Sequence, residues 1–463
     1  MKRVLVGLGA ACVLAVCIAG IVLVARVLHQ QATMRRFIAL GPANLAREEA
    51  AARQEGIPLS AGQLQRPLPP PSQNAAPLYV KLTKLLRDKP LHLPKYAEGM
   101  YAFHAYTPQQ VAAVRKALAS RQDVMTLVHR AADRPQCVFV RDWGKGLDLT
   151  FPEYQPMREA ARLVETESYL LARDGRYAEA VSNQARGFHI AKHAASDPVL
   201  ISYLVGNACE SITLAGMQSI LALAGPNAAV SGQVQRATRS DFVPLPLRVP
   251  IVNEAAAMEP VFRQLHQGQH QGIHWLDESL QGLISGKGIA SDPQHSRESV
   301  SPVEEKLVSD TIDVQRANYL SDVRRMVAAA DVPSKERRVV YATPVDASAP
   351  SARDGARTMS FILLPDGQKL DEDDVRLKAR EAVTLAAAAL LAERARTAAY
   401  SGGLPQGFLD PFTSKPLLYR REGGGFAVYS VGPTGHFDGG RPGQKVPGQE
   451  SLFRYPAVPV PPI

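Results

Sequence analysis

The chain has 463 residues, of which 46% are hydrophobic and 21% are charged, and its formal net charge is +9. This length suffices for two or three domains, each with a hydrophobic core of its own. The lysines and arginines are scattered and are not interleaved with aromatic residues, which make up only 6% of the chain. The composition therefore argues against nucleic acid as a partner.

The first segment contains 22 residues without a charge, between Arg3 and Arg26. A helix that rises about 1.5 Å per residue extends about 33 Å over this stretch, enough for a hydrocarbon core of about 30 Å. We predict a transmembrane anchor in residues 1–30 that contacts the lipid bilayer through residues 4–25. A cleaved signal peptide is the alternative, but the run is long and no small-x-small cleavage site follows it.

The charges on the two sides of the span bear on the orientation of this anchor. Lys2 and Arg3 precede the span and three arginines follow it before residue 40, so the positive-inside rule gives a near tie. The short charged stub favours an amino terminus in the cytoplasm, with the protein in the inner (cytoplasmic) membrane and the bulk of the chain in the periplasm. Outside the anchor the chain has only Cys137 and Cys209, which do not amount to a disulfide framework.

Residues 31–74 are expected to form a short helix followed by a stiff spacer. The helix is predicted in GPANLAREEAAARQEG, with Pro42 in its first turn and Gly56 at its end. The spacer is RPLPPPSQ, residues 66–73, whose prolines favour an extended backbone.

Helices are expected to dominate residues 75–332. The stretch TPQQVAAVRKALASRQDVMTLVHRAAD opens with a capping box of Thr107 and Gln110. A second capped helix is predicted from Ser301 and Pro302, and residues 156–223 give three helical segments separated by RDGR and SDP.

The joint LLARDGRYAEAVSNQ resembles the turn of a tetratricopeptide helix pair, in which Gly175 makes the bend and Tyr177 and Ala180 pack the two helices. No second copy follows about 34 residues later, as a solenoid requires. We predict one helical hairpin within a larger bundle. Binding of peptide partners through this hairpin is an alternative function.

Two later stretches, residues 269–300 and 333–357, are rich in Gly, Ser, Gln, Asp and Pro and are predicted to be loops or linkers. Within a linker of residues 333–370, SFILLPDG is either a short strand or a buried run. The next helix is expected to begin at the acidic run Asp371–Asp374. Negative charges are favourable at the amino end of a helix because the helix dipole is positive there.

The end of the chain combines this helix with two short β-prone runs. LLYRR and FAVYS are joined by EGGG, whose glycines suit a tight turn, and a hairpin alone needs a surface to lie on. The Ala/Leu face of the preceding helix offers that surface, so residues 371–440 are predicted to form an α+β module with a short antiparallel sheet. Residues 441–463 are expected to be a disordered, proline-rich tail. The fold class predicted for the whole chain is mainly α, a helical bundle, with this small C-terminal module and an N-terminal transmembrane helix.

This C-terminal stretch resembles the tail shared by many uncharacterised bacterial membrane-anchored proteins, which in turn is similar to the C-terminal module of type II secretion major pseudopilins. The residues that carry the resemblance are Asp410, Pro411, Tyr419, Tyr429, Ser430, Gly432, Gly435 and Gly440. The resemblance covers about residues 371–440. It implies a long helix that carries a small antiparallel sheet, and acidic residues in the last loop that bind calcium.

The chain departs from the pseudopilin pattern in three ways. No leader ending in Phe-Thr-Leu-Ile-Glu follows Met1, and about 340 residues separate the anchor from the module. In the last loop Thr434 and His436 leave Asp438 as the obvious carboxylate for calcium, a cation that prefers six to eight oxygen ligands.

One segment offers candidate metal ligands of another kind. In RQLHQGQHQGIHWLDESL, the histidines His266, His270 and His274 are four residues apart, which would place them on one face of a helix as zinc ligands. The glycines at 268 and 272 weaken a helix there, so an exposed polar stretch is the competing interpretation. No cofactor is expected for the chain; calcium or zinc at these two places is the alternative, and no small-molecule substrate is identified.

No nucleophile elbow, Cys-x-x-Cys or His-Glu-x-x-His motif occurs in the chain. The sequence therefore favours a single-pass membrane-anchored protein of the cell envelope, with a structural or protein-interaction role and envelope proteins as partners. An envelope metal-dependent enzyme that uses the histidine segment is the alternative.

Overall fold

The computed structural model describes residues 35–36, 38–94, 96, 105–242, 245–267, 302–342, 360, 363–364, 367–433, 435 and 451–456. These residues form a mainly helical protein with one small antiparallel sheet near the C-terminus, as predicted. The α-helices are α2 (Gly41–Gln54), α3 (Ala76–Asp88), α4 (Pro108–Ala119), α5 (Gln122–Ala132), α6 (Tyr154–Arg173), α7 (Tyr177–Ala194), α8 (Leu200–Ala224), α9 (Ala228–Asp241), α10 (Arg248–His266), α12 (Pro302–Ala330), α13 (Ser334–Ala342) and α16 (Gly367–Thr397). The described residues also form two 3-10 helices, η1 (Ala61–Leu64) and η3 (Trp143–Asp148), and three strands, β1 (Leu418–Glu422), β2 (Gly425–Tyr429) and β3 (Leu452–Tyr455).

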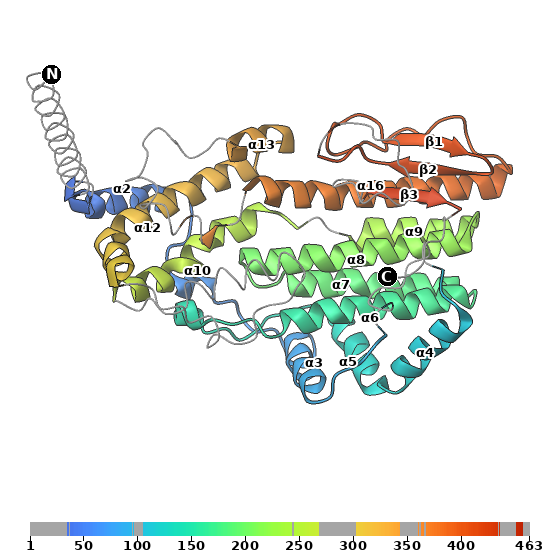
Figure 1. Ribbon diagram of the computed structural model, residues 1–463, viewed down its shortest axis with the longest axis horizontal. Helices are drawn as coiled ribbons and strands as arrows, with labels where there is room; N and C mark the ends of the chain where they lie inside the picture. Colours follow the sequence, from blue (N-terminus) through green and yellow to red (C-terminus); the bar gives the residue numbers. More distant parts are fainter. Residues whose placement is uncertain are drawn as a thin grey trace, which may run out of the picture.

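The centre of the molecule is the antiparallel stack of α6, α7 and α8, which run side by side in Figure 1. The hairpin between α6 and α7 was predicted correctly: Gly175 adopts a φ of +74°, and Ala180 is fully buried in the core. The Tyr177 hydroxyl donates to the Leu223 carbonyl at 3.3 Å, which ties this hairpin to α8. Its turn residues therefore serve packing within the bundle.

The close approach of α7 and α8 depends on a glycine. A Cβ added to Gly187 on α7 would lie 2.2 Å from Oγ1 of Thr213 on α8, and Thr213 is fully buried. Gln184, one turn earlier on α7, donates to the Thr213 carbonyl at 3.0 Å. Glycine at 187 thus lets the two backbones pack at a distance that a larger residue would prevent.

The C-terminal sheet lies on α16, as expected from the apolar face of that helix (Figure 1). The strands are ordered β1-β2-β3, and Phe426 of β2 pairs with Arg421 of β1 and Tyr455 of β3. Phe426 and Val428 are fully buried and share one hydrophobic cluster with Leu390 of α16. The same cluster includes residues of α7, α8 and α9, so the sheet and α16 pack on the central bundle.

The opposite end of the molecule from the sheet is formed by α2, α10 and α12 (Figure 1). Pro42 lies in the first turn of α2 and Gly56 adopts a φ of +73° just after it, as predicted. Arg324 of α12 pairs with Glu48 at 2.7 Å and also with Glu55. The first helix after the predicted anchor is therefore held on the body by ion pairs.

Several predicted boundaries differ from the structure. The capping box of Thr107 and Gln110 is present. The helix that it opens ends at Ala119, and the backbone of Arg121 is not helical, so α5 is a separate helix. The guanidinium of Arg121 is buried, where it bonds to the Lys89 carbonyl and Asp123, which explains the break. Ser301 lies outside the described residues.

Two segments that the sequence predicted as irregular contain regular structure. Residues 334–342, placed in a linker, form α13, whose arginines pair with α16. Residues 452–455, placed in a disordered tail, form β3, and Phe453 is buried against Phe426. In both cases tertiary contacts outweigh the loop-like composition of the surrounding sequence. The run SFILLPDG was expected to be either a short strand or a buried run. Its Leu363 is buried in a core cluster, which favours the buried run.

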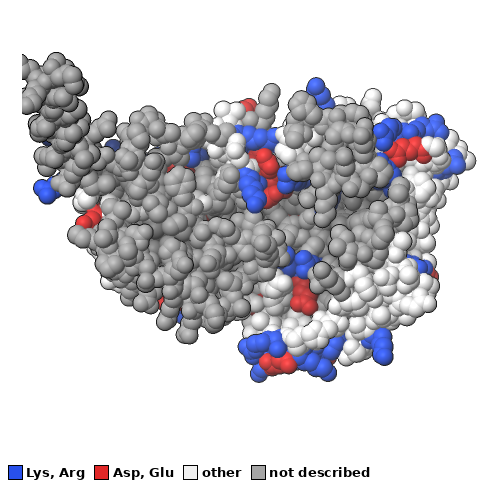
Figure 2. Space-filling view, in the orientation of Figure 1, with Lys and Arg blue, Asp and Glu red and all other residues white. Residues whose placement is uncertain are grey.

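The described surface carries its charges in mixed pairs. Figure 2 shows blue and red atoms side by side at the sheet end, where Arg454 bonds to Glu422 at 2.7 Å and Arg420 contacts the same carboxylate. Cys137 and Cys209 are both buried and unpaired. Among the helices that the structure describes, none is both long and apolar enough to cross a bilayer, and the predicted anchor in residues 4–25 lies outside the described residues.

Candidate functional site

The candidate site is a crevice of about 250 Å³ at the point where α8 and α10 begin. We call it the Arg66 crevice. Its wall is formed by Arg66, Ala195, Ser196, Asp197, Pro198, Tyr203, Leu245, Pro246, Val249 and Pro250. Six of these ten residues are apolar, so the crevice is a largely hydrophobic space with a few polar groups, as is usual for small-ligand sites.

Arg66 comes from the predicted proline-rich spacer and contacts the loop between α7 and α8. Its Nη1 donates to the Ser196 carbonyl at 2.6 Å, and this bond fixes the guanidinium beside the crevice. Arg66 is exposed and forms no ion pair with an acidic side chain in the described part of the chain. One edge of its planar fork is therefore available to a ligand.

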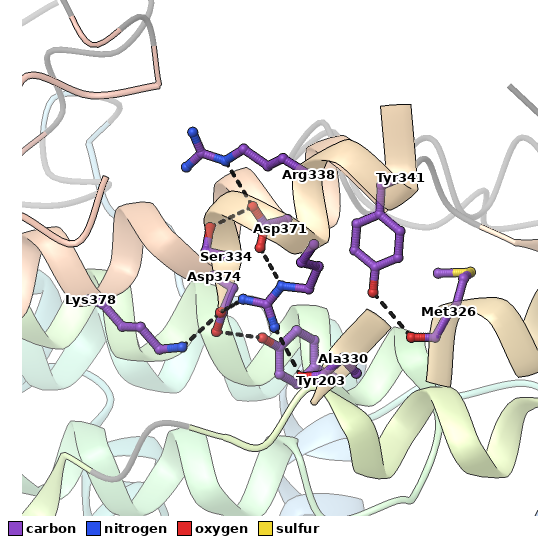
Figure 3. A network of polar contacts seen from close by, with 10 residues as sticks. Tyr203, Met326, Ala330, Ser334, Arg338, Tyr341, Asp371, Asp374 and Lys378 are labelled. Carbon is purple, nitrogen blue, oxygen red and sulfur yellow. Dashed lines mark hydrogen bonds and ion pairs between the residues drawn. The ribbon is translucent and has the colours of Figure 1, made fainter. Parts of the chain in front are cut away.

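Tyr203 connects the crevice to a buried ionic network, which Figure 3 shows from close by. Its hydroxyl donates to Oδ1 of Asp374 at 3.1 Å, and Lys378 approaches Oδ2 of the same carboxylate at 2.8 Å. Burial and the adjacent Asp374 carboxylate raise the pKa of Tyr203 well above 10, so the hydroxyl keeps its proton and acts as a donor.

The second carboxylate of this network is Asp371, which is fully buried. Ser334 donates to its Oδ2 at 2.9 Å and Arg338 to the same oxygen at 3.0 Å. Arg337 bridges the two carboxylates, with its Nε on Asp371 and its Nη2 3.2 Å from Asp374. Figure 3 shows both aspartates directed from α16 toward α13. Three helices, α8, α13 and α16, therefore meet at this network.

This arrangement corrects the interpretation of the acidic run Asp371–Asp374. The helix begins at Gly367, one turn before the run, so Asp371 and Asp374 are not capping residues at a helix start. Both are buried, and a buried carboxylate is stable only when cations and hydrogen-bond donors surround it. The run is instead the anionic half of an interhelical ion network.

A second buried ionic cluster supports the crevice from the other side. Asp197, on the crevice wall, accepts hydrogen bonds at its Oδ2 from Arg141 Nε at 3.0 Å and from the Tyr154 hydroxyl at 2.8 Å. Arg141 also donates to Glu153 at 2.9 Å, and its guanidinium lies 4.4 Å from the centroid of the Phe139 ring. Burial disfavours the charged form of Arg141, but the carboxylates, Asp197 foremost, outweigh it and raise its pKa.

The interior next to this region holds two carboxyl groups without full hydrogen bonding. Neither side-chain oxygen of Glu210 on α8 has a hydrogen-bond partner in the described structure, and one oxygen of Glu254 on α10 also lacks one. Burial raises the pKa of each to about 8. For Glu210, Lys192 opposes the shift, while Asp374 and Glu381 add to it. Burial therefore favours the protonated form of both carboxyls.

The candidate metal ligands are not brought together in the described part of the chain. His266 lies exposed in the last turn of α10, and His270, His274 and Asp438 lie outside the described residues. Among the residues that the structure does describe, no group of three or more His, Cys, Asp or Glu side chains could hold a metal ion. The zinc and calcium sites remain predictions from the sequence.

The amino-acid sequence carries little signal for the Arg66 crevice. Its wall comes from segments up to 184 residues apart, Arg66 to Pro250, and no local motif marks such a contact. Comparison with known proteins adds no further guide: no family model, no curated protein and no solved structure matches this chain.

Proposed function

We propose that this chain is a single-pass membrane-anchored protein of the cell envelope, with a structural or protein-interaction role outside the cytoplasm. The observation that carries the proposal is the uncharged stretch of 22 residues between Arg3 and Arg26. Its length matches a bilayer core of about 30 Å when it is helical.

The geometry of the body is consistent with attachment at one end. Helix α2 follows the proposed anchor and lies at the end of the molecule opposite the sheet (Figure 1). Arg316 pairs with Glu49 at 3.0 Å, in addition to the contacts of Arg324 with Glu48 and Glu55. With α2 fixed in this way, the sheet end would project away from the membrane toward partners.

The resemblance to the pseudopilin module supports an envelope role for the C-terminal unit. In that unit α16 carries the sheet, and buried Asp410 accepts hydrogen bonds from the Ser430 hydroxyl at 3.0 Å and the Val431 amide at 2.8 Å. Asp410 therefore has a structural role that needs no calcium. We propose a pseudopilin-like shape for this unit, without polymerisation.

The proposal is tested with a reporter enzyme that is active only outside the cytoplasm, fused after residue 463 of the full-length chain. The fusion is expected to be active. Replacing Leu14 and Ile18 together by arginine should abolish that activity, because each arginine near the bilayer centre costs about 2.5–3.5 kcal/mol. Leu40→Arg, outside the span and 57% exposed, is the matched control and should leave the reporter active. An inactive wild-type fusion, with normal protein levels, contradicts export.

A further inference from the structure

We infer that the Arg66 crevice binds a small amphipathic monocarboxylate, with the carboxylate on Arg66 and the apolar part between Pro198, Val249 and Pro250. The first step in the argument is size. An engineered protein cavity of about 150 Å³ holds a benzene molecule, and this crevice has a volume of about 250 Å³. A phenyl ring or a short alkyl chain therefore fits, with room for a polar end.

The second step is polarity. Most of the wall is built from Ala195, Pro198, Leu245, Pro246 and Pro250, none of which offers a side-chain hydrogen bond. Val249 is 48% exposed, an apolar side chain that a ligand would remove from water. Prolines and short aliphatic residues make a rigid wall, which lowers the entropy lost when a ligand is bound.

The third step is charge. Arg66 is exposed, is oriented by its 2.6 Å bond to the Ser196 carbonyl and has no acidic partner in the described residues. A carboxylate matches the two-pronged donor geometry of a guanidinium, as a phosphate does, and Arg66 is the one cation among the described lining residues, which suits a singly charged group. The helices α8 and α10 also begin at the crevice, and the amino ends of helices favour a negative charge.

One residue on the wall opposes this assignment. Asp197 is acidic, and with Arg141 and Glu153 it forms a cluster with one excess negative charge. Asp197 is only 6% exposed, however, and its Oδ2 is already bound by Arg141 and Tyr154. The cation that a ligand can reach is Arg66, so the anionic ligand is favoured. A cationic amphiphile is the competing outcome and belongs in the test.

The test uses the full-length chain in lipid nanodiscs, with empty nanodiscs as the blank, and saturation-transfer difference NMR to detect binding. The test ligand is 3-phenylpropionate, and 3-phenylpropylamine is its cationic counterpart. We expect saturable binding of the acid with a Kd in the millimolar range or tighter, and at least about tenfold weaker binding of the amine.

Arg66→Gln should weaken binding of the acid at least about tenfold, whereas Arg66→Lys, which keeps the charge, should weaken it less. Val249→Asp should also weaken it, because a carboxylate at the rim repels the ligand. Val80→Asp on α3 is the matched control, since Val80 is 51% exposed and lies away from the crevice. Far-ultraviolet circular dichroism of each variant verifies that the helices are retained.

A second ligand identifies the source of the carboxylate. N-acetyl-phenylalanine carries the carboxylate and side chain of a peptide C-terminus. Tighter binding of this compound than of 3-phenylpropionate assigns the crevice to a protein C-terminus, and weaker binding assigns it to a free small acid. Absence of saturable binding by both acids, equal binding of the amine, or acid binding unchanged in Arg66→Gln each overturns the inference. None of these results bears on membrane anchoring, which the reporter fusion tests separately.

Discussion

The hydroxyl of Tyr203 donates a 3.1 Å hydrogen bond to Oδ1 of Asp374, a residue 171 positions later in the chain. Tyr203 also lies on the wall of the Arg66 crevice. One side chain thus connects the crevice with the ion network that joins α8, α13 and α16. Since the network fixes Tyr203, one wall of the crevice is held in place before any ligand arrives.

The ion network is expected to be essential for stability. Arg337→Met removes the guanidinium that pairs with both Asp371 and Asp374. Asp371 is fully buried and Asp374 is 3% exposed. Breaking a buried ion pair by removing one partner costs about 3–5 kcal/mol, and we expect a loss near the lower limit because Arg338 and Lys378 remain. Chemical denaturation measures this loss. Arg53→Met, which removes an exposed pair with Glu49, should cost less than about 1 kcal/mol.

The buried carboxyl of Glu210 is expected to make stability depend on pH. Its pKa is raised to about 8 in the folded protein by burial, against 4.5 for an ordinary glutamate. The folded state keeps a proton that the unfolded chain releases, so the free energy of unfolding should fall as pH rises from about 4.5 to 8.

Glu210→Gln keeps the shape of that side chain but cannot lose a proton. The variant should therefore lose less stability than the wild type between pH 5 and pH 8, measured by urea denaturation at several pH values. Glu254, whose pKa is also about 8, is unchanged in the variant, so part of the wild-type slope should remain. If the free energy of unfolding changes with pH by the same amount in both proteins, Glu210 is ionised in the folded state.

Arg158 on α6 is buried, and no carboxylate in the described residues neutralises its positive charge. The residue is 5% exposed, its Nε has no hydrogen-bond partner, and no side chain in the described residues forms an ion pair with it. Burial and the neighbouring Arg162 lower its pKa. Arg158→Met should therefore raise the free energy of unfolding, by on the order of 1 kcal/mol or more. Arg186→Met, which breaks a 2.8 Å pair with Asp133, should not. A melting temperature that falls in Arg158→Met contradicts this interpretation.

The packing of α7 on α8 should be sensitive to a single methyl group. A Cβ at position 187 would lie 2.2 Å from the Thr213 hydroxyl oxygen, so Gly187→Ala must push the helices apart. Overpacking of this kind costs about 1–3 kcal/mol. At Gly403, nothing lies within 4 Å of an added Cβ, and Gly403→Ala should leave thermal stability nearly unchanged. Equal melting temperatures for the two variants would refute the close contact.

The features that the sequence predicts well depend on local signals. The bend at Gly175, the capping box of Thr107 and Gln110 and the β-hairpin around EGGG follow from residues within one or two turns of each other. The sheet was expected to rest on α16 because a hairpin needs an apolar surface, and the buried Phe426 bears this out.

The features that were missed depend on contacts between distant residues. Asp371 resembles a helix-capping residue in the sequence, and only the position of Arg337 and Ser334 on α13 gives it a buried partner. The strand around Phe453 was hidden in a proline-rich tail, because its stability comes from pairing with β2 and packing on Phe426. The Arg66 crevice likewise exists only after three segments, at residues 66, 195–203 and 245–250, have come together.

We propose that the chain is held in a membrane by residues 4–25 while its helical body lies outside the bilayer. The most direct measurement is the distribution of the full-length chain after membranes are washed at alkaline pH in sodium carbonate and sedimented. We predict that the wild-type chain stays in the pellet until detergent is added, whereas the double variant Leu14→Arg/Ile18→Arg is released. Recovery of the intact wild-type chain in the supernatant without detergent would contradict the claim.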